Sequence, residues 1–544
     1  MEEDVPGHFK EVVRGSFWNL TGNIFFKAVS FFYYILVAHA VSQGELDLFF
    51  LALGIITLFD PLDDFGLAPS LSRFIPFMEG RGEKGRVKEL VFAGYAVSLA
   101  SSFIMMGIVY FQADLIASIY RNAHLAAALQ TLCIMLVLSN LGKITSAFQQ
   151  SQKDIKGMQA LSNAQNLLKL VITLVMFDIY GPTLFSLATG ALGSTAISLA
   201  LISPIIIRRI AALPGHLFAG KASIPLFREV LSFGLALTAV NVVGAFLFST
   251  DIALLGYFSA ATTGAIAIYF VAFSLSIALT VLPFSMDTIF SPLMANFHGK
   301  KEMGKMAETL DAATRWSFLI MIPPAIVFLT IPEYLLSTIF GESYVGGASA
   351  LSLMVVGVVV SVLHHPISLA LSSMRMIGRI MKVYIPGGVM FALLTFILTP
   401  SIGILGPCVA GLAANVFMLF AYRKEIGSVL PMKPLGGLLK MALGGIFVLA
   451  IMLVSKPFLL SLAQLLPSFS GMGDAQLYLD KALLLAFLIV PTAMALSLFS
   501  VALLLLRCLS ADDVSIFKRA LLKMRIPEPL SSWLMQLASH GTKV

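Results

Sequence analysis

The chain has 544 residues, of which 58% are hydrophobic and 12% charged, whereas a soluble chain carries about twice that charged fraction. This composition excludes an ordinary soluble enzyme and indicates an integral membrane protein. The formal net charge of +7 requires no nucleic-acid partner, because lysine and arginine gather in loops between apolar segments, where they set the topology of a membrane protein.

Apolar stretches of roughly 20 to 28 residues recur along the chain, and about 30 Å of hydrocarbon requires a helix of that length. They predict an all-α integral membrane protein with about fourteen transmembrane helices. The predicted spans are residues 14–40, 46–72, 88–112, 122–148, 156–180, 183–207, 227–255, 262–293, 314–340, 345–373, 378–399, 402–422, 436–462 and 479–507.

Lysine and arginine test this division into helices, because they accumulate in cytoplasmic loops. They fill alternate loops, and the opposite loops hold almost none beyond Arg121, Lys456 and Lys481. The alternation predicts an even number of helices in the cytoplasmic membrane with both termini in the cytoplasm. We expect the first span to be retained, because its apolar run is too long for a cleavable signal peptide.

The first span carries a polar face. Asn19, Asn23, Lys27, Ser30 and Tyr34 recur at intervals of three or four residues and therefore share one side of the helix. Lys27 lies roughly 20 Å beyond the cytoplasmic end of this helix, near the bilayer midplane. A lysine costs about 3 kcal/mol at that depth, so this face is predicted to line a wet cavity or to bind an anion.

The second span carries acidic groups in its inner half: Asp60, Asp63 and Asp64. They could couple transport to an ion or gate the protein. They could also pair with lysines or cap a broken helix, since Asp60 precedes Pro61 and Asp64 precedes a turn sequence around Gly66. The structural interpretation is favoured for these acidic residues.

A short sequence that follows the second span indicates an internal duplication. Residues 80–89 (GRGEKGRVKE) recur as residues 299–308 (GKKEMGKMAE), with two glycines, two glutamates and two cations at the same spacing. The first six helices then correspond to the next six, which predicts parallel repeats with the substrate path between them. The predicted parts are a lobe at 1–207, a cytoplasmic linker at 208–226, a second lobe at 227–424, two additional transmembrane helices at 425–510 and a cytoplasmic amphipathic tail at 511–544.

The fifth span repeats the pattern of the first. Asn163, Asn166 and Lys169 share a face, and Lys169 is again near the midplane. For Lys27 and Lys169 a role in a cavity is favoured over a structural one. Lys143, in the fourth span, lies nearer the cytoplasmic end, and for it a cavity role and snorkelling to the headgroups remain equally open.

Titratable groups in the later spans are fewer. Asp251 lies near the outer end of the seventh span, and Asp287 near the inner end of the eighth. His364 and His365 lie inside the tenth, where they could form a proton relay or a buried, hydrogen-bonded pair. The cysteines lack disulfide or metal spacing, so neither a metal nor another cofactor is predicted.

Several motifs resemble those of polysaccharide flippases, which include lipid-linked oligosaccharide translocators. They are GSFWNL at 15–20, FFYYILVA at 31–38, DFGL at 64–67, RFIP at 73–76 and DIALLGYF at 251–258. The resemblance covers roughly the first 430 residues, and the order and spacing of the motifs make it specific. One departure is Glu45-Leu46-Asp47, which stands where the family has a more usual polar-acidic turn.

The resemblance implies twelve to fourteen helices in two parallel lobes around a cation-lined cavity, which receives the pyrophosphate-sugar head of a polyprenyl lipid. Lys27, Lys143 and Lys169 could supply the cations, although no family motif specifies them individually. The neighbouring Asn and Ser side chains would bind sugar. Candidates for coupling or gating are Asp251, Asp64, Asp60 and His364.

The sequence therefore predicts a flippase that moves polyprenyl-diphosphate-linked oligosaccharide by alternating access, and not an enzyme. Expected partners are the lipid-linked oligosaccharide, membrane lipids and the glycan polymerase or glycosyltransferases of the same pathway.

Three alternatives stay open. A cation- or proton-coupled drug exporter of the same superfamily would favour an acidic, aromatic-lined cavity. A peptidoglycan-precursor flippase would share the lipid carrier. A membrane glycosyltransferase or polymerase would need acidic residues on a sizeable external loop, whereas the loop that holds Glu45 and Asp47 spans only a few residues.

Overall fold

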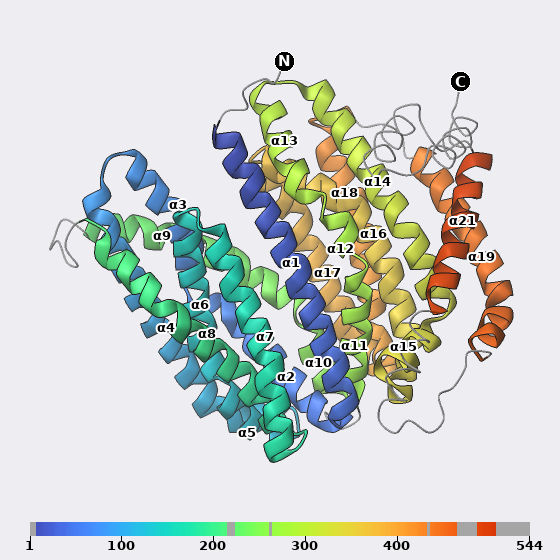
Figure 1. Cartoon of the computed structure of the whole chain (residues 1–544), viewed down its shortest axis with the longest axis horizontal. Coiled ribbons are helices and arrows are strands. Elements are labelled where there is room, and N and C mark those ends of the chain that lie inside the picture. Colours follow the sequence, from blue (N-terminus) through green and yellow to red (C-terminus); the bar gives the residue numbers. More distant parts are fainter. Residues whose placement is uncertain (1–6, 215–223, 260–263, 432–435, 465–486, 507–544) are drawn as a thin grey trace. The chain divides into compact units, whose positions relative to one another are not determined.

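The computed structural model describes residues 7–214, 224–259, 264–431, 436–464 and 487–506, and all regular secondary structure in those ranges is helical (Figure 1). In chain order the described helices are α1 Gly7–Ala40, α2 Gln43–Asp63, α3 Leu67–Gly80, α4 Lys84–Ile119, α5 His124–Leu132, α6 Ile134–Ser151, α7 Ile155–Tyr180, α8 Leu184–Ala212, α9 Ile224–Phe248, α10 Asp251–Phe258, α11 Ala265–Ala278, α12 Val281–Phe284, α13 Asp287–Gly299, α14 Met303–Thr330, α15 Pro332–Phe340, the 3-10 helix η2 Glu342–Gly347, α16 Ala348–Ser373, α17 Ile377–Ile402, α18 Leu405–Gly427, α19 Gly436–Gln464 and α21 Ile489–Leu505. The predicted all-α membrane class is confirmed.

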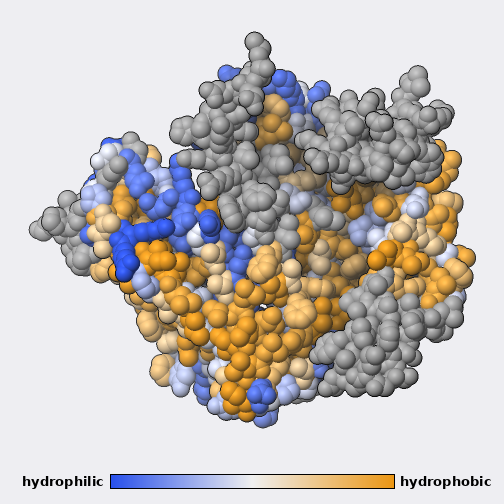
Figure 2. All heavy atoms as spheres, in the orientation of Figure 1, coloured by the Kyte–Doolittle hydropathy of each residue, from blue (hydrophilic) through white to orange (hydrophobic). Residues whose placement is uncertain are grey.

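The surface of these helices is suited to lipid. Within the described ranges, 10 helices are long and apolar enough to cross a membrane. Large apolar side chains lie on the outside, as with Phe111, which is 82% exposed. Figure 2 shows apolar residues covering much of the visible face, including that of α7, with hydrophilic residues gathered near the end of α3. Such an exterior is stable in hydrocarbon and not in water. The total of fourteen spans remains a prediction.

The chain forms two compact units. The first comprises residues 1–271 and 385–410, and the second comprises 272–384 and 411–544. In the first unit α1 packs against α7, α7 against α8, and α9 against both α2 and α3. In the second, α14 packs against α16, α19 and α21. The six-helix lobes at 1–207 and 227–424 and the amphipathic tail at 511–544 remain predictions, and the tail lies outside the described residues.

The second predicted span, 46–72, is wrong as a single helix. It divides into α2 and α3 at a turn where Phe65 and Gly66 adopt left-handed φ angles of 48° and 66°. A Cβ atom on residue 66 would collide with the carbonyl oxygen of Gly234 on α9, so the turn requires glycine for both its φ angle and its packing. The turn expected around Gly66 is confirmed.

Four other predicted spans are divided into shorter helices, although residues 124–151 still form one segment long and apolar enough to cross a membrane. The divisions lie at a turn at Cys133, at Ser249-Thr250, at the turns 279–280 and 285–286, and just before Pro332. The pairs or triplets are α5 and α6 for 122–148, α9 and α10 for 227–255, α11, α12 and α13 for 262–293, and α14 and α15 for 314–340.

The duplicated loops share one local structure. Their third residues, Gly82 and Lys301, both adopt left-handed φ angles, of 78° and 58°. In each loop the N–H of the next residue, a glutamate, donates at 3.0 Å to a carbonyl five residues earlier, which is a common way to end a helix. Each loop also has an ion pair three residues apart: Glu83 with Arg86 at 3.2 Å, and Glu302 with Lys305 at 3.1 Å.

This repetition leads to a topological prediction. If the loops are equivalent and the repeats parallel, both loops lie on the cytoplasmic side, as the positive charge distribution predicts. Cysteine-accessibility labelling should place positions 83, 218, 302 and 428 in the cytoplasm and positions 43, 260 and 470 outside. Labelling of positions 83 and 302 from opposite sides would disprove parallel repeats.

Candidate functional site

A lysine ammonium lies against two tyrosine rings between α7 and α1. Lys169 Nζ is 4.1 Å from the ring centroid of Tyr33 and 5.6 Å from that of Tyr34. Among the described residues no carboxylate pairs with it. A desolvated cation over an aromatic face gains about 2 kcal/mol, so the rings hold this charge in place without neutralising it. The ammonium stays available to an anionic ligand.

The predicted polar faces of α1 and α7 meet. Asn166 is buried, and its Nδ2 donates to the carbonyl of Phe26 at 2.8 Å and to Ser30 Oγ at 2.6 Å, both on α1. The amide of Asn166 therefore holds α7 against α1. This contact fixes the position of Lys169 on α7 relative to Lys27 on α1.

The other residues predicted on the polar faces of α1 and α7 differ in how exposed they are. Lys27 and Asn23 are exposed on α1. Asn163 is half-buried, and its Oδ1 has no hydrogen-bond partner within the described ranges. Asn19 belongs to α1, but its side chain lies outside the described residues. An exposed lysine near the midplane is costly against lipid, which favours a water-filled surface around Lys27.

Lys143 contacts the acidic residues of α2. Its Nζ lies 2.7 Å from Asp60 Oδ1 and 3.5 Å from Asp63 Oδ1, and it donates to the carbonyl of Asp60 at 3.3 Å. The Asp63 side chain is fully buried. Asp64 has a different role, since its Oδ1 accepts from the N–H of Gly66 at 2.7 Å and stabilises the turn. The charge on Lys143 is thus already balanced by two carboxylates.

Asn140, a residue that the sequence did not single out, reinforces the α2 break. It is buried on α6, and its Nδ2 donates to the carbonyls of Asp63 at 3.0 Å and Ser98 at 3.1 Å. The end of α2 leaves such carbonyls without partners in their own helix. A polar asparagine inside an apolar span is the feature from which the sequence could have predicted a buried hydrogen bond at this position.

Glu45 and Asp47 each bind the N-terminus of another helix. Glu45 Oε2 accepts from the N–H of Leu184 at 2.6 Å, at the start of α8. Asp47 is buried, and its Oδ1 accepts from the N–H of Ala267 at 2.7 Å, at the start of α11. Carboxylates at these positions satisfy free N–H groups and interact favourably with the helix dipole. Their arrangement gives no support to a catalytic acidic pair.

Asp251 begins α10 and accepts a hydrogen bond from the hydroxyl of Tyr269 at 2.6 Å. Both residues belong to the first unit. The contact gives this predicted coupling residue a specific hydrogen-bond partner, which would be lost if α10 and α11 moved apart.

In the second unit the two neighbouring histidines have different partners. His364 Nε2 lies 3.1 Å from Asn415 Oδ1, and its ring stacks on Tyr422. His365 Nε2 lies 2.7 Å from Asp287 Oδ2, and both of these side chains are about one-third exposed. His365 therefore contacts an acidic partner, whereas His364 contacts a neutral amide. The sequence pointed to both histidines as candidates, but it could not show that they have different partners.

No group of three or more His, Cys, Asp or Glu side chains in the described part of the chain could hold a metal ion.

Comparison with known proteins finds one family profile, one curated relative and several structures of similar fold. Residues 83–349 match the profile of the polysaccharide biosynthesis protein family. An uncharacterized membrane protein of Methanocaldococcus jannaschii is 21% identical over 421 residues, 74% of this chain and 81% of that protein. The lipid II flippase MurJ in an inward closed conformation has a similar fold, with a TM-score of 0.68 and 15% identity over 92% of this chain and 99% of that one. The chain therefore has the fold of these transporters, and its residues 83–349 resemble the polysaccharide biosynthesis protein family.

A multidrug transporter also has a similar fold. An inward-facing multidrug resistance MATE family transporter matches with a TM-score of 0.58 and 15% identity, over 76% of this chain and 95% of that one. At such identities the likeness establishes the fold and not the substrate. The matching structures are a lipid flippase and a multidrug transporter, so the substrate of this chain has to be argued from the charges of its own site.

Proposed function

We propose that the chain is a flippase that translocates a polyprenyl-diphosphate-linked oligosaccharide across the cytoplasmic membrane. The observation that carries this proposal is Lys169, a cation that contacts Tyr33 and Tyr34 and has no carboxylate partner among the described residues. Lys27 adds a second cation on α1, the helix to which Asn166 of α7 is hydrogen-bonded.

The charge requirement of the substrate fits these residues. A diphosphate carries at least two negative charges and cannot enter hydrocarbon unless fixed cations replace its hydration. Lys27 and Lys169 supply such charges, while Asn23 and Asn163 offer amides to the sugar hydroxyls. The apolar tail can remain in the bilayer throughout. Lys143 is the weakest of the proposed ligands, because Asp60 and Asp63 already compensate its charge.

Alternating access would arise from movement of two six-helix lobes about this site. Net flow requires either an ion gradient or downstream consumption of the oligosaccharide by a polymerase or glycosyltransferase. The coupling candidates with a specific partner are Asp251, hydrogen-bonded to Tyr269, and His365, paired with Asp287. Asp60 and Asp64 have structural contacts, and His364 contacts Asn415, a neutral amide.

A drug exporter is the second candidate, and one observation favours it. Next to Lys169, the ring of Tyr34 packs 5.1 Å from Phe270, which stacks on Phe50 at 3.9 Å. An aromatic surface of this kind suits hydrophobic drugs, and it also suits the apolar faces of sugars. A peptidoglycan-precursor flippase remains compatible with the same cations.

Ligand-dependent stability separates the flippase from the exporter. Polyprenyl-diphosphate sugars should raise the melting temperature of the detergent-solubilised protein, because a ligand that binds only the folded state stabilises it. Hydrophobic cations of the drug class should have little effect, because the site presents unpaired lysines. The measurement is a thermal shift assay at matched ligand concentrations, repeated with Lys169→Ala. Stabilisation by the cations alone would replace the flippase proposal by the exporter.

A further inference from the structure

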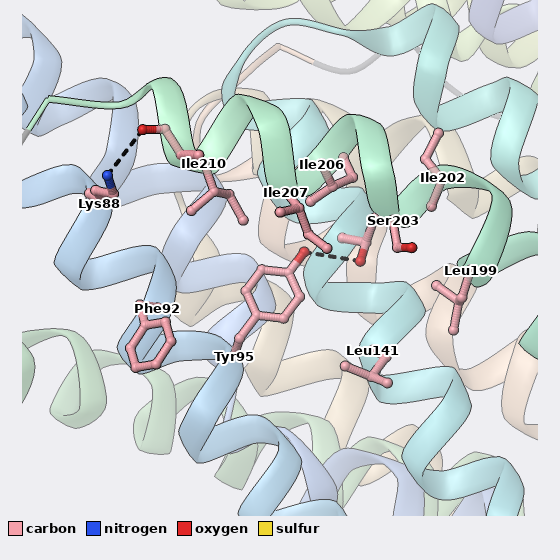
Figure 3. Close-up of a pocket in the computed structure, with 12 residues that line it drawn as sticks. Lys88, Phe92, Tyr95, Leu141, Leu199, Ile202, Ser203, Ile206, Ile207 and Ile210 are labelled. Carbon is pink, nitrogen blue, oxygen red and sulfur yellow. Dashed lines mark hydrogen bonds between the residues drawn. The ribbon is translucent and has the colours of Figure 1, made fainter. Parts of the chain in front are cut away.

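A cavity of about 480 Å³ lies in the first unit, between α4, α6 and α8. Figure 3 shows Phe92 and Tyr95 of α4 facing the isoleucines of α8. The walls are mainly branched aliphatic side chains, including Leu141, Leu199 and Ile202. All three helices have the length and hydropathy of membrane spans. The cavity is separate from Lys169, Tyr33 and the other residues of the proposed substrate site.

The polar atoms in the wall already have partners. The hydroxyls of Tyr95 and Thr145 lie 3.0 Å apart and hydrogen-bond to each other. Ser203 Oγ donates to the carbonyl of Ala200 at 2.9 Å. A polar ligand inside the cavity would lose its hydrogen bonds to water and gain few in return. The interior therefore suits an alkyl chain.

One end of the cavity carries a cation. Lys88 is the charged residue among those that line it, and its Nζ donates to the carbonyl of Ala211 at 3.0 Å, in the last turn of α8 (Figure 3). An ammonium has three N–H donors, and among the described residues Lys88 makes no ion pair. Lys88 lies near the start of α4, at the predicted cytoplasmic side. A fixed cation beside an apolar chamber matches a phosphate attached to an alkyl chain.

We propose that this cavity binds an anionic phospholipid of the inner leaflet, with one acyl chain inside and the phosphate at Lys88. A cavity of about 480 Å³ with this apolar lining suits one alkyl chain, and Lys88 at its end suits a phosphate attached to that chain. The attraction between Lys88 and the phosphate is the kind that draws cationic residues to anionic leaflets.

The test is native mass spectrometry of the delipidated full-length protein with added phosphatidylglycerol or phosphatidylcholine. Phosphatidylglycerol should bind preferentially, and Lys88→Gln should lower its affinity by about fivefold, whereas Lys88→Arg should retain most of it. Leu199→Trp should fill the cavity and prevent binding at this site. Leu201→Trp is the matched control, because Leu201 is on the same helix, 66% exposed, and does not line the cavity.

Equal binding of phosphatidylglycerol to the Leu199→Trp and Leu201→Trp variants would overturn the proposal. If Leu199→Trp does not fold, Ser203→Phe fills the same wall and serves instead. Competing ligands then identify the molecule that occupies the cavity. Displacement of the phospholipid by inorganic phosphate would show a site for a free anion, and preferential binding of a polyprenyl phosphate would show a site for the transport lipid. Either result would contradict a phospholipid site without affecting the proposal for Lys27 and Lys169.

Discussion

The double substitution Lys27→Ala and Lys169→Ala is expected to abolish translocation while the protein still inserts into the membrane. Each lysine supplies a charge that a diphosphate needs at mid-depth, so the single variants should be impaired and the double variant inactive. Loss of a charge-assisted contact costs about 1.5–3 kcal/mol, which corresponds to a reduction in binding of roughly tenfold or more for each lysine. The measurement is complementation of a glycan pathway that lacks its flippase, with the protein level in the membrane checked by immunoblotting.

Two controls separate charge from structure in that experiment. Lys27→Arg should retain more activity than Lys27→Gln, because arginine keeps the positive charge although its geometry differs. Lys382→Ala removes an exposed lysine on α17 and should leave activity unchanged. Full complementation by the double alanine variant would contradict the cationic-site proposal and leave the assignment of the fold unaffected.

The sequence was sufficient to predict the membrane class and the positions of most helices, because both depend on hydropathy along the chain. It located the turn around Gly66 but not the interruptions in the other spans, because apolar residues continue across those. The break between α2 and α3 depends on a left-handed Gly66 packed against Gly234, and that contact joins residues far apart in the chain. A run of apolar residues contains no record of such a contact.

Long-range contacts also decided the roles of charged residues. Glu45 and Asp47 lie two residues apart, yet they bind the starts of α8 and α11, which are 139 and 220 positions away. His364 and His365 are adjacent and chemically identical, and only the packing of α16 gives His365 its contact with Asp287. The shared face of Asn166 and Lys169, by contrast, could be predicted, because it follows from helical periodicity alone.

Lys143→Met is expected to destabilise the folded protein. The substitution leaves Asp63, whose side chain is fully buried, without its cation, and removal of one partner from a buried ion pair costs about 3 kcal/mol or more. The melting temperature in detergent should therefore fall. Methionine keeps the length and apolar stem of lysine, so the lost charge accounts for the effect better than a cavity does.

A double-substitution experiment decides whether Lys143 stabilises the folded protein or binds the substrate. If its main role is to compensate Asp60 and Asp63, adding Asp63→Asn to Lys143→Met should recover part of the lost stability, because a neutral amide costs less to bury than an unpaired carboxylate. Such coupling between contacting residues is what a double-mutant cycle measures. If Lys143→Met instead melts like the unmodified protein and loses stabilisation by polyprenyl diphosphates, Lys143 belongs with Lys27 and Lys169 in the substrate site, and its contacts with α2 would describe one state of the transport cycle.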